Sequence, residues 1–181
     1  MKHMALGGSV ALLAVAAGTA QAGLSGTFTE IHGQKVDGTS AFDTSISIPQ
    51  FDDQAGTRQL VGVTLLLEFE AGSLVTAEND AAAPAPNFTL NLAGTVHVAF
   101  GDFDRTDGLY KSMVESVGAT DGIANSGPDF MDYGNVLRRV TTTTEQTTGL
   151  SAYSGTGTLG ALINAEAAFS YTGTSDATIR T

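Results

Sequence analysis

Residues 59–70, QLVGVTLLLEFE, contain the longest strand-like apolar run of the chain outside its N-terminus. The near-continuous apolar stretch from Val61 to Phe69 indicates a strand that is covered on both faces, or nearly so. Such a strand needs partners for its backbone groups and a second layer against its side chains. We therefore expect residues 59–70 to form the central strand of a β-fold.

Shorter strand-like segments, separated by turn residues, occupy much of the remaining chain. Thr, Ser, Gly and Val are abundant, while Lys, Arg and Glu are sparse, and this composition favours strands and turns over helices. The pattern predicts an all-β fold of about nine strands, an antiparallel β-sandwich of jelly-roll or immunoglobulin-like type. The segments concerned are 26–32, 44–48, 59–70, 73–78, 88–92, 95–100, 135–148, 150–158, 167–173 and 176–180.

Two Ala-Gly pairs, at 71–72 and 93–94, interrupt apolar runs and are interpreted as tight hairpin connections. Residues 101–135 are rich in Gly, Asp and Asn and are expected to be the least regular part, with one short helix at YKSMVESV, 110–117. The segment LGALINAEAAF, 159–169, is the best alternative candidate for a helix because of its Ala and Leu content.

The N-terminus has the pattern of an export signal. Lys2 provides a positively charged n-region, residues 5–19 form an apolar segment, and Ala20–Ala22 match a small-x-small cleavage site. The apolar segment is shorter than the roughly 20 residues that a membrane-spanning helix needs, which argues against the alternative of an N-terminal anchor. We expect a signal peptide at 1–22, a single β-sandwich domain at 23–181, and no membrane span after cleavage.

Charge and residue usage exclude several classes of function. Without Lys2, seven of the eight basic side chains remain against 19 acidic ones, so the surface should repel nucleic acid and anionic lipid. The absence of cysteine excludes disulfides, thiol catalysis and cysteine-bound metals. The absence of tryptophan weakens an aromatic platform for sugars.

Asp52 and Asp53 stand next to each other just before the central run. Adjacent residues of an extended chain point to opposite faces, so this pair is not expected to act as a general acid and base. An aspartate that hydrogen-bonds to its own backbone in a turn accounts for the pair without chemistry. We interpret the pair as a chain corner, with a metal ligand as the alternative.

The segment GDFDRTDG, 101–108, is the sharpest candidate for a metal site. Asp102, Asp104 and Asp107, followed by Gly108, resemble a calcium loop, although the spacing has one residue more than the usual pattern. An acidic, solvated loop is the alternative interpretation. Further oxygen ligands could come from Asp121, Asn125, Asp129 and Asp132 if the chain folds back.

Two weaker constellations point to carbohydrate. Glu68 and Glu70 are two residues apart on one expected strand, so they share a face and could flank a glycosidic bond. Tyr110, Tyr133 and Tyr153 are the candidates for stacking on sugar rings. His97 alternates with valines and is expected to face solvent or a partner strand.

Several short motifs carry a family resemblance. They are IPQFD at 48–52, GT at 56–57, LVGV at 60–63, AEND at 77–80 and YSGTGTL at 153–159. Together they resemble the choice-of-anchor E domain of exported bacterial proteins, many of which carry a PEP-CTERM sorting tail. The resemblance covers roughly residues 26–181 and implies a β-rich, secreted or surface-associated domain with no assigned enzymatic activity and no catalytic residues.

The chain departs from that family pattern at its end. Sorted members finish in Pro-Glu-Pro, an apolar span and a basic cluster, whereas this sequence stops at DATIRT, so a released protein and a truncated sequence both stay open as interpretations.

Our main hypothesis is a non-enzymatic bacterial surface or extracellular-matrix protein that acts in assembly or adhesion, with a filament subunit as one version. Its expected partners are its own copies or an extracellular polysaccharide, and calcium is the one candidate cofactor. A carbohydrate-binding module is the alternative, and a glycoside hydrolase is a remote one.

Overall fold

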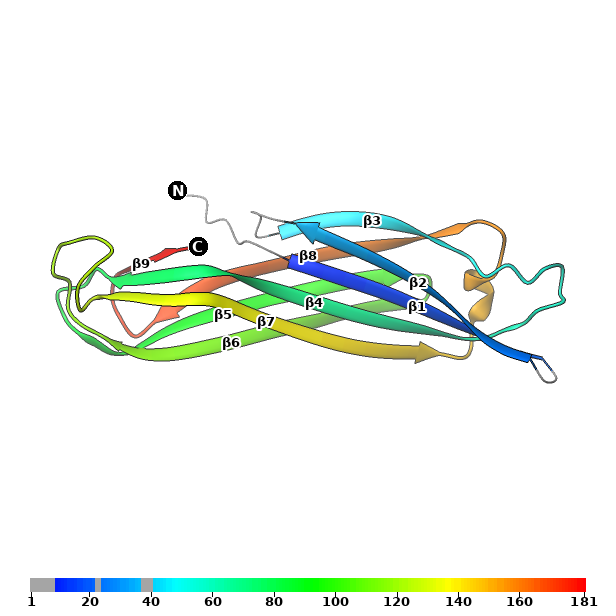
Figure 1. Ribbon diagram of the computed structural model, residues 1–181, viewed down its shortest axis with the longest axis horizontal. Helices are drawn as coiled ribbons and strands as arrows, with labels where there is room; N and C mark the ends of the chain where they lie inside the picture. Colours follow the sequence, from blue (N-terminus) through cyan, green and yellow to red (C-terminus); the bar gives the residue numbers. More distant parts are fainter. Residues whose placement is uncertain (1–8, 22–23, 37–40) are drawn as a thin grey trace.

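The computed structural model describes residues 9–21, 24–36 and 41–181 of the chain. Two antiparallel β-sheets extend along an elongated body, and the described residues contain a single short helical turn (Figure 1). The prediction of an all-β fold with two antiparallel sheets is therefore confirmed at this level.

One sheet has the strand order β2-β1-β4-β7, with β9 paired to β4 as well, and the other has the order β3-β8-β5-β6. The elements are β1 (Ser9–Gln21), β2 (Leu24–Val36), β3 (Ala41–Pro49), β4 (Leu60–Asn79), β5 (Ala85–Phe100), β6 (Phe103–Val117), β7 (Phe130–Gln146), η1 (Leu150–Tyr153), β8 (Thr158–Thr172) and β9 (Ala177–Arg180). Strand β1 falls within the predicted signal peptide, while the predicted cleavage point between residues 22 and 23 lies outside the described residues.

The two predicted Ala-Gly hairpins are wrong, because β4 and β5 each continue through the Ala-Gly pair. A Cβ atom on Gly72 would lie 2.4 Å from the carbonyl oxygen of Val136 in β7. A Cβ atom on Gly94 would lie 2.8 Å from that of Glu166 in β8. Both glycines thus permit close approach of a neighbouring strand and do not turn the chain. The merged segments explain why residues 41–181 form seven strands and not the about nine short ones expected.

The predicted short helix at 110–117 is also wrong, since these residues belong to β6, and the alternative helix at 159–169 belongs to β8. In β8 every second side chain from Ala161 to Phe169 is buried, which is the two-residue period of a strand. Burial of one face against the opposite sheet outweighs the helical preference of Ala and Leu.

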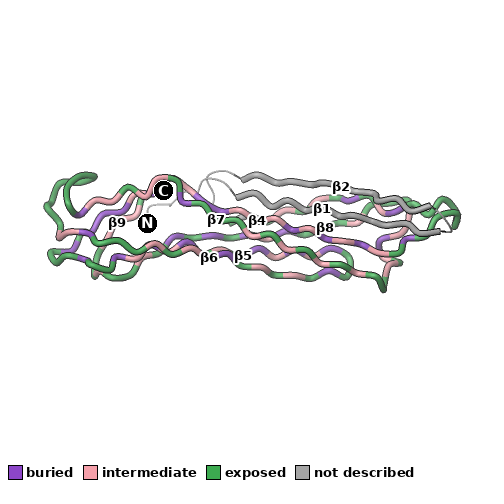
Figure 2. The backbone as a smooth tube through the Cα atoms, turned by 60° about the horizontal axis from the view of Figure 1, so that its bottom comes forward, coloured by how far each residue is buried: buried purple, intermediate pink, exposed green. Residues whose placement is uncertain are grey.

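The core lies between the two sheets and is shared by all the long strands from β4 to β8 (Figure 2). Along β4, the odd-numbered side chains from Val63 to Phe69 are at most 2% exposed, while the even-numbered ones are partly exposed. The central run is thus fully buried on one face only, and on the other it is half covered. The largest fully buried side chains are Phe69, Phe88, Ile48, Leu65, Leu90, Leu92 and Ile163.

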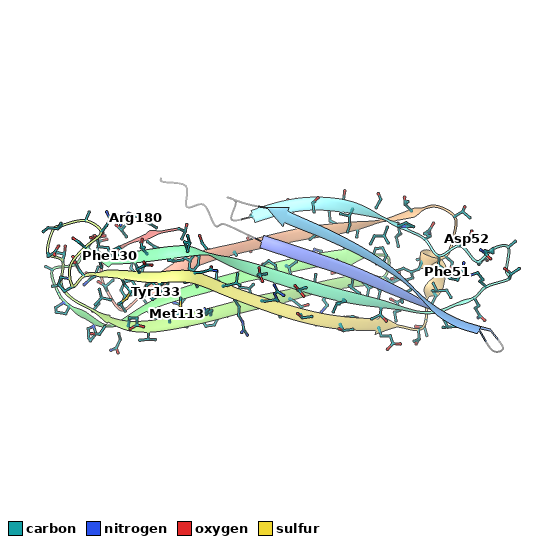
Figure 3. All side chains as sticks on the ribbon, in the orientation of Figure 1. Phe51, Asp52, Met113, Phe130, Tyr133 and Arg180 are labelled. Carbon is teal, nitrogen blue, oxygen red and sulfur yellow. The ribbon has the colours of Figure 1, made fainter. Side chains whose placement is uncertain are left out.

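The acidic pair does form a corner, as expected. Strand β3 ends at Pro49, and the Oδ1 atom of Asp52 accepts a hydrogen bond from the backbone N–H of Gln54 at 2.8 Å. Gln54 and Gly56 both have positive φ, of 50° and 82°, so the chain reverses here before β4 begins. Asp52 lies at one end of the molecule in Figure 3.

The corner is held by the segment that follows β7. The backbone N–H of Phe51 donates to the carbonyl of Tyr153 at 2.8 Å, and the N–H of Gly155 donates back to the carbonyl of Phe51 at 2.9 Å. The N–H of Gln50 donates to the carbonyl of Gly157 at 3.0 Å. Two of the motifs that carry the family resemblance are therefore hydrogen-bonded to each other.

Asn79 connects the loops at the opposite end of the molecule. It is fully buried, and its Nδ2 atom donates to the carbonyls of Ala83 at 2.9 Å and Gly118 at 2.6 Å. Its Oδ1 atom accepts from the N–H of Ala81 at 3.3 Å and from the hydroxyl of Thr174 at 2.6 Å. The side chain of Asn79 thus makes hydrogen bonds with three backbone groups and one hydroxyl, which belong to three separate segments of the chain.

We predict that Asn79→Ala lowers the free energy of unfolding by about 2–4 kcal/mol, because it leaves buried backbone groups without partners. Urea denaturation of the mature chain would measure this change. The matched control is Asn87→Ala, at an exposed position of the same region, which should stay within about 0.5 kcal/mol. Equal effects of the two substitutions would contradict the role assigned to Asn79.

Candidate functional site

The outer face of the four-stranded sheet carries a row of polar side chains across all four strands. The Nε2 atom of His97 on β5 lies 2.9 Å from Oδ1 of Asp104 on β6, and its Nδ1 atom lies 3.3 Å from Oδ1 of Asn164 on β8. Asn164 in turn donates through Nδ2 to Asp43 on β3. The strand register creates the row, since His97 stands directly opposite Asn164, and Asn164 directly opposite Asp43.

Both ring nitrogens of His97 face an acceptor oxygen, and only the imidazolium form can donate to both at once. The hydrogen bond to Asp104, followed by that to Asn164, raises the pKa of His97 above its ordinary value. With both nitrogens engaged in this way, the ring has none left to activate a hydroxyl nucleophile. The sequence indicated only that His97 would face outward, and the pairing with Asp104 depends on the β5–β6 register.

A shallow concavity of about 410 Å³ lies beside this row. Its walls are partly polar and partly apolar, and the hydroxyl of Thr95 donates a hydrogen bond of 3.3 Å to Glu166 in one of them. The lining residues are Ala41, Asp43, Thr95, His97, Asn164, Ala165 and Glu166. Over the described ranges of the chain, no group of three acidic or histidine side chains is arranged to hold a metal ion.

The three residues of the predicted calcium loop do not converge. Asp104 points to the outer face of β6 and contacts His97, while Asp107 bonds to Arg105, whose Nε lies 2.8 Å from Oδ2 of Asp107. Asp102 lies in the β5–β6 turn, 3.4 Å from the side-chain nitrogen of Gln146. Most of the predicted loop is strand here, and alternate strand residues point to opposite faces. Calcium binding stays a prediction without support from this arrangement.

Three further aspartates named from the sequence accept hydrogen bonds from backbone N–H groups between residues 121 and 134, in the loop before β7 and in β7 itself. Asp121 Oδ1 accepts from the N–H of Ile123 at 2.8 Å, and Asp132 Oδ1 accepts from the N–H of Gly134 at 2.8 Å. Asp129 is fully buried, and its Oδ2 accepts from the N–H of Asp121 at 2.9 Å, while its Oδ1 has no partner. These are the short-range bonds by which aspartates stabilise turns.

Glu68 and Glu70 share the outer face of β4, as predicted, and Arg139 of β7 lies between them. Its Nη1 is 3.1 Å from Glu68 Oε1, and its Nε is 2.8 Å from Glu70 Oε2. The hydrogen bond to Glu70 is the main cause that raises the pKa of Arg139. One guanidinium bridging both carboxylates occupies the space that a sugar would need between them.

The three candidate tyrosines do not share a surface. Tyr110 is 60% exposed, whereas Tyr153 is buried against Phe100 and Phe103, with ring centroids 5.4 and 5.9 Å away. The hydroxyl of Tyr133 is buried without a partner, and burial, with a smaller contribution from Glu115, raises its pKa to about 12. Only Tyr110 is therefore placed to stack on a ligand.

The edge of β4 is the second candidate site. On the side away from β7, β1 pairs with β4 from Leu60 to Ala71, and β9 pairs with it from Thr76 to Asn79. Between them, the described part of the chain places no strand against residues 72–75 on that side. Leu74, in the middle of this interval, is 72% exposed. Unpaired backbone beside an exposed apolar side chain is a site where another strand can pair.

Comparison of the chain with protein-family models, with curated proteins and with solved structures finds no match. No helix among the described residues has the length and apolar character to cross a membrane.

We predict that Asp104→Asn returns the pKa of His97 towards 6.5, because it removes the main hydrogen-bond acceptor of the imidazolium. Since the folded pKa is raised, the contribution of this pair to stability is complete below 6.5 and disappears as the pH rises through the folded pKa. An NMR titration of His97 measures the shift. Asp53→Asn, in the distant corner, is the control and should leave the titration unchanged, and an unchanged titration in Asp104→Asn would refute the pairing.

We predict opposite effects for two tyrosine substitutions. Tyr133→Phe removes a buried hydroxyl that has no partner and should raise the free energy of unfolding by up to about 1 kcal/mol. Tyr153→Phe should lower it by about 1–2 kcal/mol, because the hydroxyl accepts the N–H of Asp102 at 2.8 Å. Thermal melts of the two variants test the contrast, which fails if both move in the same direction.

Proposed function

We propose that this chain is an exported, non-enzymatic structural protein that assembles through its sheet edges at the bacterial cell surface or in the extracellular matrix. The single observation that carries the proposal is the interval of β4 at residues 72–75, beside the exposed Leu74, with which no described strand pairs on the side away from β7. Folded proteins usually cover or blunt such edges, since they pair readily with other chains. An interval of β4 edge that lacks a partner among the described strands suits assembly by strand addition.

Apolar side chains on the outer faces support lateral packing of copies. Leu74 and Leu137 lie on the outer face of one sheet, with exposed fractions of 72% and 41%, and Val114 is 59% exposed on the other sheet. A Cβ atom on Gly72 would lie 2.7 Å from a methyl carbon of Leu137, so the side chain of Leu137 covers that part of β4. Exposed apolar groups on both faces favour side-by-side contacts.

We also propose a jelly-roll or immunoglobulin-like sandwich, which is supported by the antiparallel pairing between all the described strands and by a chain that passes repeatedly between the two sheets. Membership of the choice-of-anchor E family is proposed on the short sequence motifs, two of which, at 48–52 and 153–159, are hydrogen-bonded to each other. Both assignments agree with a secreted structural role.

We predict that the mature chain, residues 23–181, forms concentration-dependent oligomers or fibres. Added NaCl should promote them, because the mature chain has seven basic against 19 acidic side chains, a formal net charge of −12, and salt screens repulsion between like-charged bodies. Multi-angle light scattering and negative-stain electron microscopy at increasing protein concentration provide the measurement.

The same samples with millimolar calcium or with EDTA test the candidate cofactor. If calcium acts only by screening, an equal ionic strength of NaCl gives the same degree of assembly. A monomer at high concentration under all of these conditions would refute the proposed function.

A further inference from the structure

Strand β1 occupies an interior position, between β2 and β4 (Figure 1). Its residues Ser9–Thr19 pair with the interval Leu60–Ala71 of β4, and its whole length pairs with β2. The same residues lie within the predicted signal peptide, 1–22. Under the proposed export, cleavage would therefore remove an interior strand and not a peripheral one.

Loss of β1 would open a long edge on β4. On the edge away from β7, the interval 60–71 would lose its partner and would join the interval 72–75, with which no described strand pairs, as far as the start of β9 pairing at Thr76. At about 3.3 Å per residue, this edge would be roughly 50 Å long. An edge of this length, uninterrupted by proline, pairs readily with an added strand.

Loss of β1 would leave an empty position in the sheet between β2 and β4, which we call the slot. The apolar face of the opposite sheet behind this slot would become exposed as well. Contacts between the two sheets join β2 to β3, β4 to β5 and β7 to β6. Strand β1 lies between β2 and β4 in one sheet, and β8 lies between β3 and β5 in the other, so β1 lies opposite β8. The inward side chains of β8 are at most 7% exposed. They are Ala161, Ile163, Ala165, Ala167 and Phe169. The vacated slot would thus have an apolar floor and would favour a replacement strand.

Cleavage would also leave a strand without a partner. Strand β2 pairs with β1 alone among the described strands, and it becomes the N-terminal strand of the mature chain. It has 13 residues, as β1 does. Its sequence, LSGTFTEIHGQKV, contains Phe, Ile, Val and Thr without proline, and it is far more polar than the signal segment. A single cleavage would create both an empty slot and a free strand of matching length.

The geometry of the chain argues against an antiparallel return of β2 within its own molecule. Val36 lies at the Ala71 end of β4, close to the start of β3 (Figure 1). Antiparallel pairing with β4 would move Val36 to the Leu60 end, roughly 36 Å away at 3.3 Å per residue. The connection from Val36 to Ala41 spans at most about 18 Å. Within one molecule only a parallel arrangement is reachable, whereas a second copy has no such restriction.

We infer that the mature chain polymerises by strand exchange, in which residues 24–36 of one copy pair antiparallel with residues 60–71 of β4 in the next copy. This inference rests on the proposed function and names its donor and acceptor segments. The incoming strand takes the position and the direction that β1 has here. Because donor and acceptor are different surfaces, the contact is head to tail and yields an open filament.

The absence of cysteine permits a clean cross-linking test with the mature chain. One population carries Glu68→Cys on β4, and a second carries a single donor-strand cysteine, Thr27→Cys, Phe28→Cys, Thr29→Cys or Glu30→Cys in turn, since Glu68 pairs with Leu12, the fourth residue of β1, and Thr27 is the fourth residue of the donor. After mixing and mild oxidation, we expect at least one donor position to give a disulfide-linked heterodimer at a yield at least tenfold above that of Asn87→Cys mixed with Glu68→Cys. No heterodimer above this control at any donor position would overturn the inference.

A chain carrying both Glu68→Cys and the best donor cysteine separates exchange from return within one molecule. We expect a ladder of disulfide-linked oligomers on non-reducing gels. An internally linked monomer, identified by mass spectrometry, would show that β2 fills its own slot and would overturn the inference.

A peptide of residues 24–36 provides a test that leaves the folded chain unaltered. In tenfold excess it should cap the acceptor edge and reduce the sedimented assembly at least tenfold. The matched control peptide carries Thr29→Pro and Glu30→Pro and should have no effect, because proline removes the backbone donors of a strand. Assembly that is insensitive to the peptide would overturn the inference while leaving the proposed function standing. Absence of assembly in the untreated chain would overturn both.

Discussion

The pairing of β4 along both of its edges is the interaction on which the rest of the structure depends. One edge pairs with β7 over most of its length, and the other with β1 and then β9. Its inward side chains form the centre of the core, opposite β5. Because the chain has no cysteine, these ladders and the apolar layer between the sheets must hold the fold without covalent cross-links. Any change in what pairs with β4 therefore changes the stability and the association of the whole molecule.

Polar side chains complete the structure where strands end. Asn79 joins three segments at one end, and the backbone bonds of Phe51 with Tyr153 and Gly155 join the corner to the segment after β7 at the other. Away from the ends, Arg139 neutralises Glu68 and Glu70 on one outer face. The acidic groups that resembled sites of chemistry thus have structural partners.

Individual turns, glycines and strands show where prediction from sequence was possible. The corner at Pro49–Gly56 was predictable because proline, aspartate and glycine act through local backbone preferences. The Ala-Gly pairs were misread because a glycine in a turn and a glycine under a neighbouring strand look the same in one sequence. Only the 2.4 Å approach of the Val136 carbonyl to a Cβ atom at Gly72 distinguishes the two cases. The helix predicted at 110–117 failed for a similar reason, since pairing of β6 with β5 overrides a weak local preference.

The candidate sites divide in the same way. The sequence by itself determined the class of fold, the corner, and the shared face of Glu68 and Glu70, because these follow from local geometry and from a period of two residues. The sequence could not show that Asp104 contacts His97, that Asp102 and Asp107 have different partners, or that Tyr153 and the hydroxyl of Tyr133 are buried. Those outcomes depend on which strands become neighbours and in what register. The tertiary structure alone decided them, and it alone placed the N-terminal segment beside β4, because strand pairing is a long-range choice that no short stretch of sequence encodes.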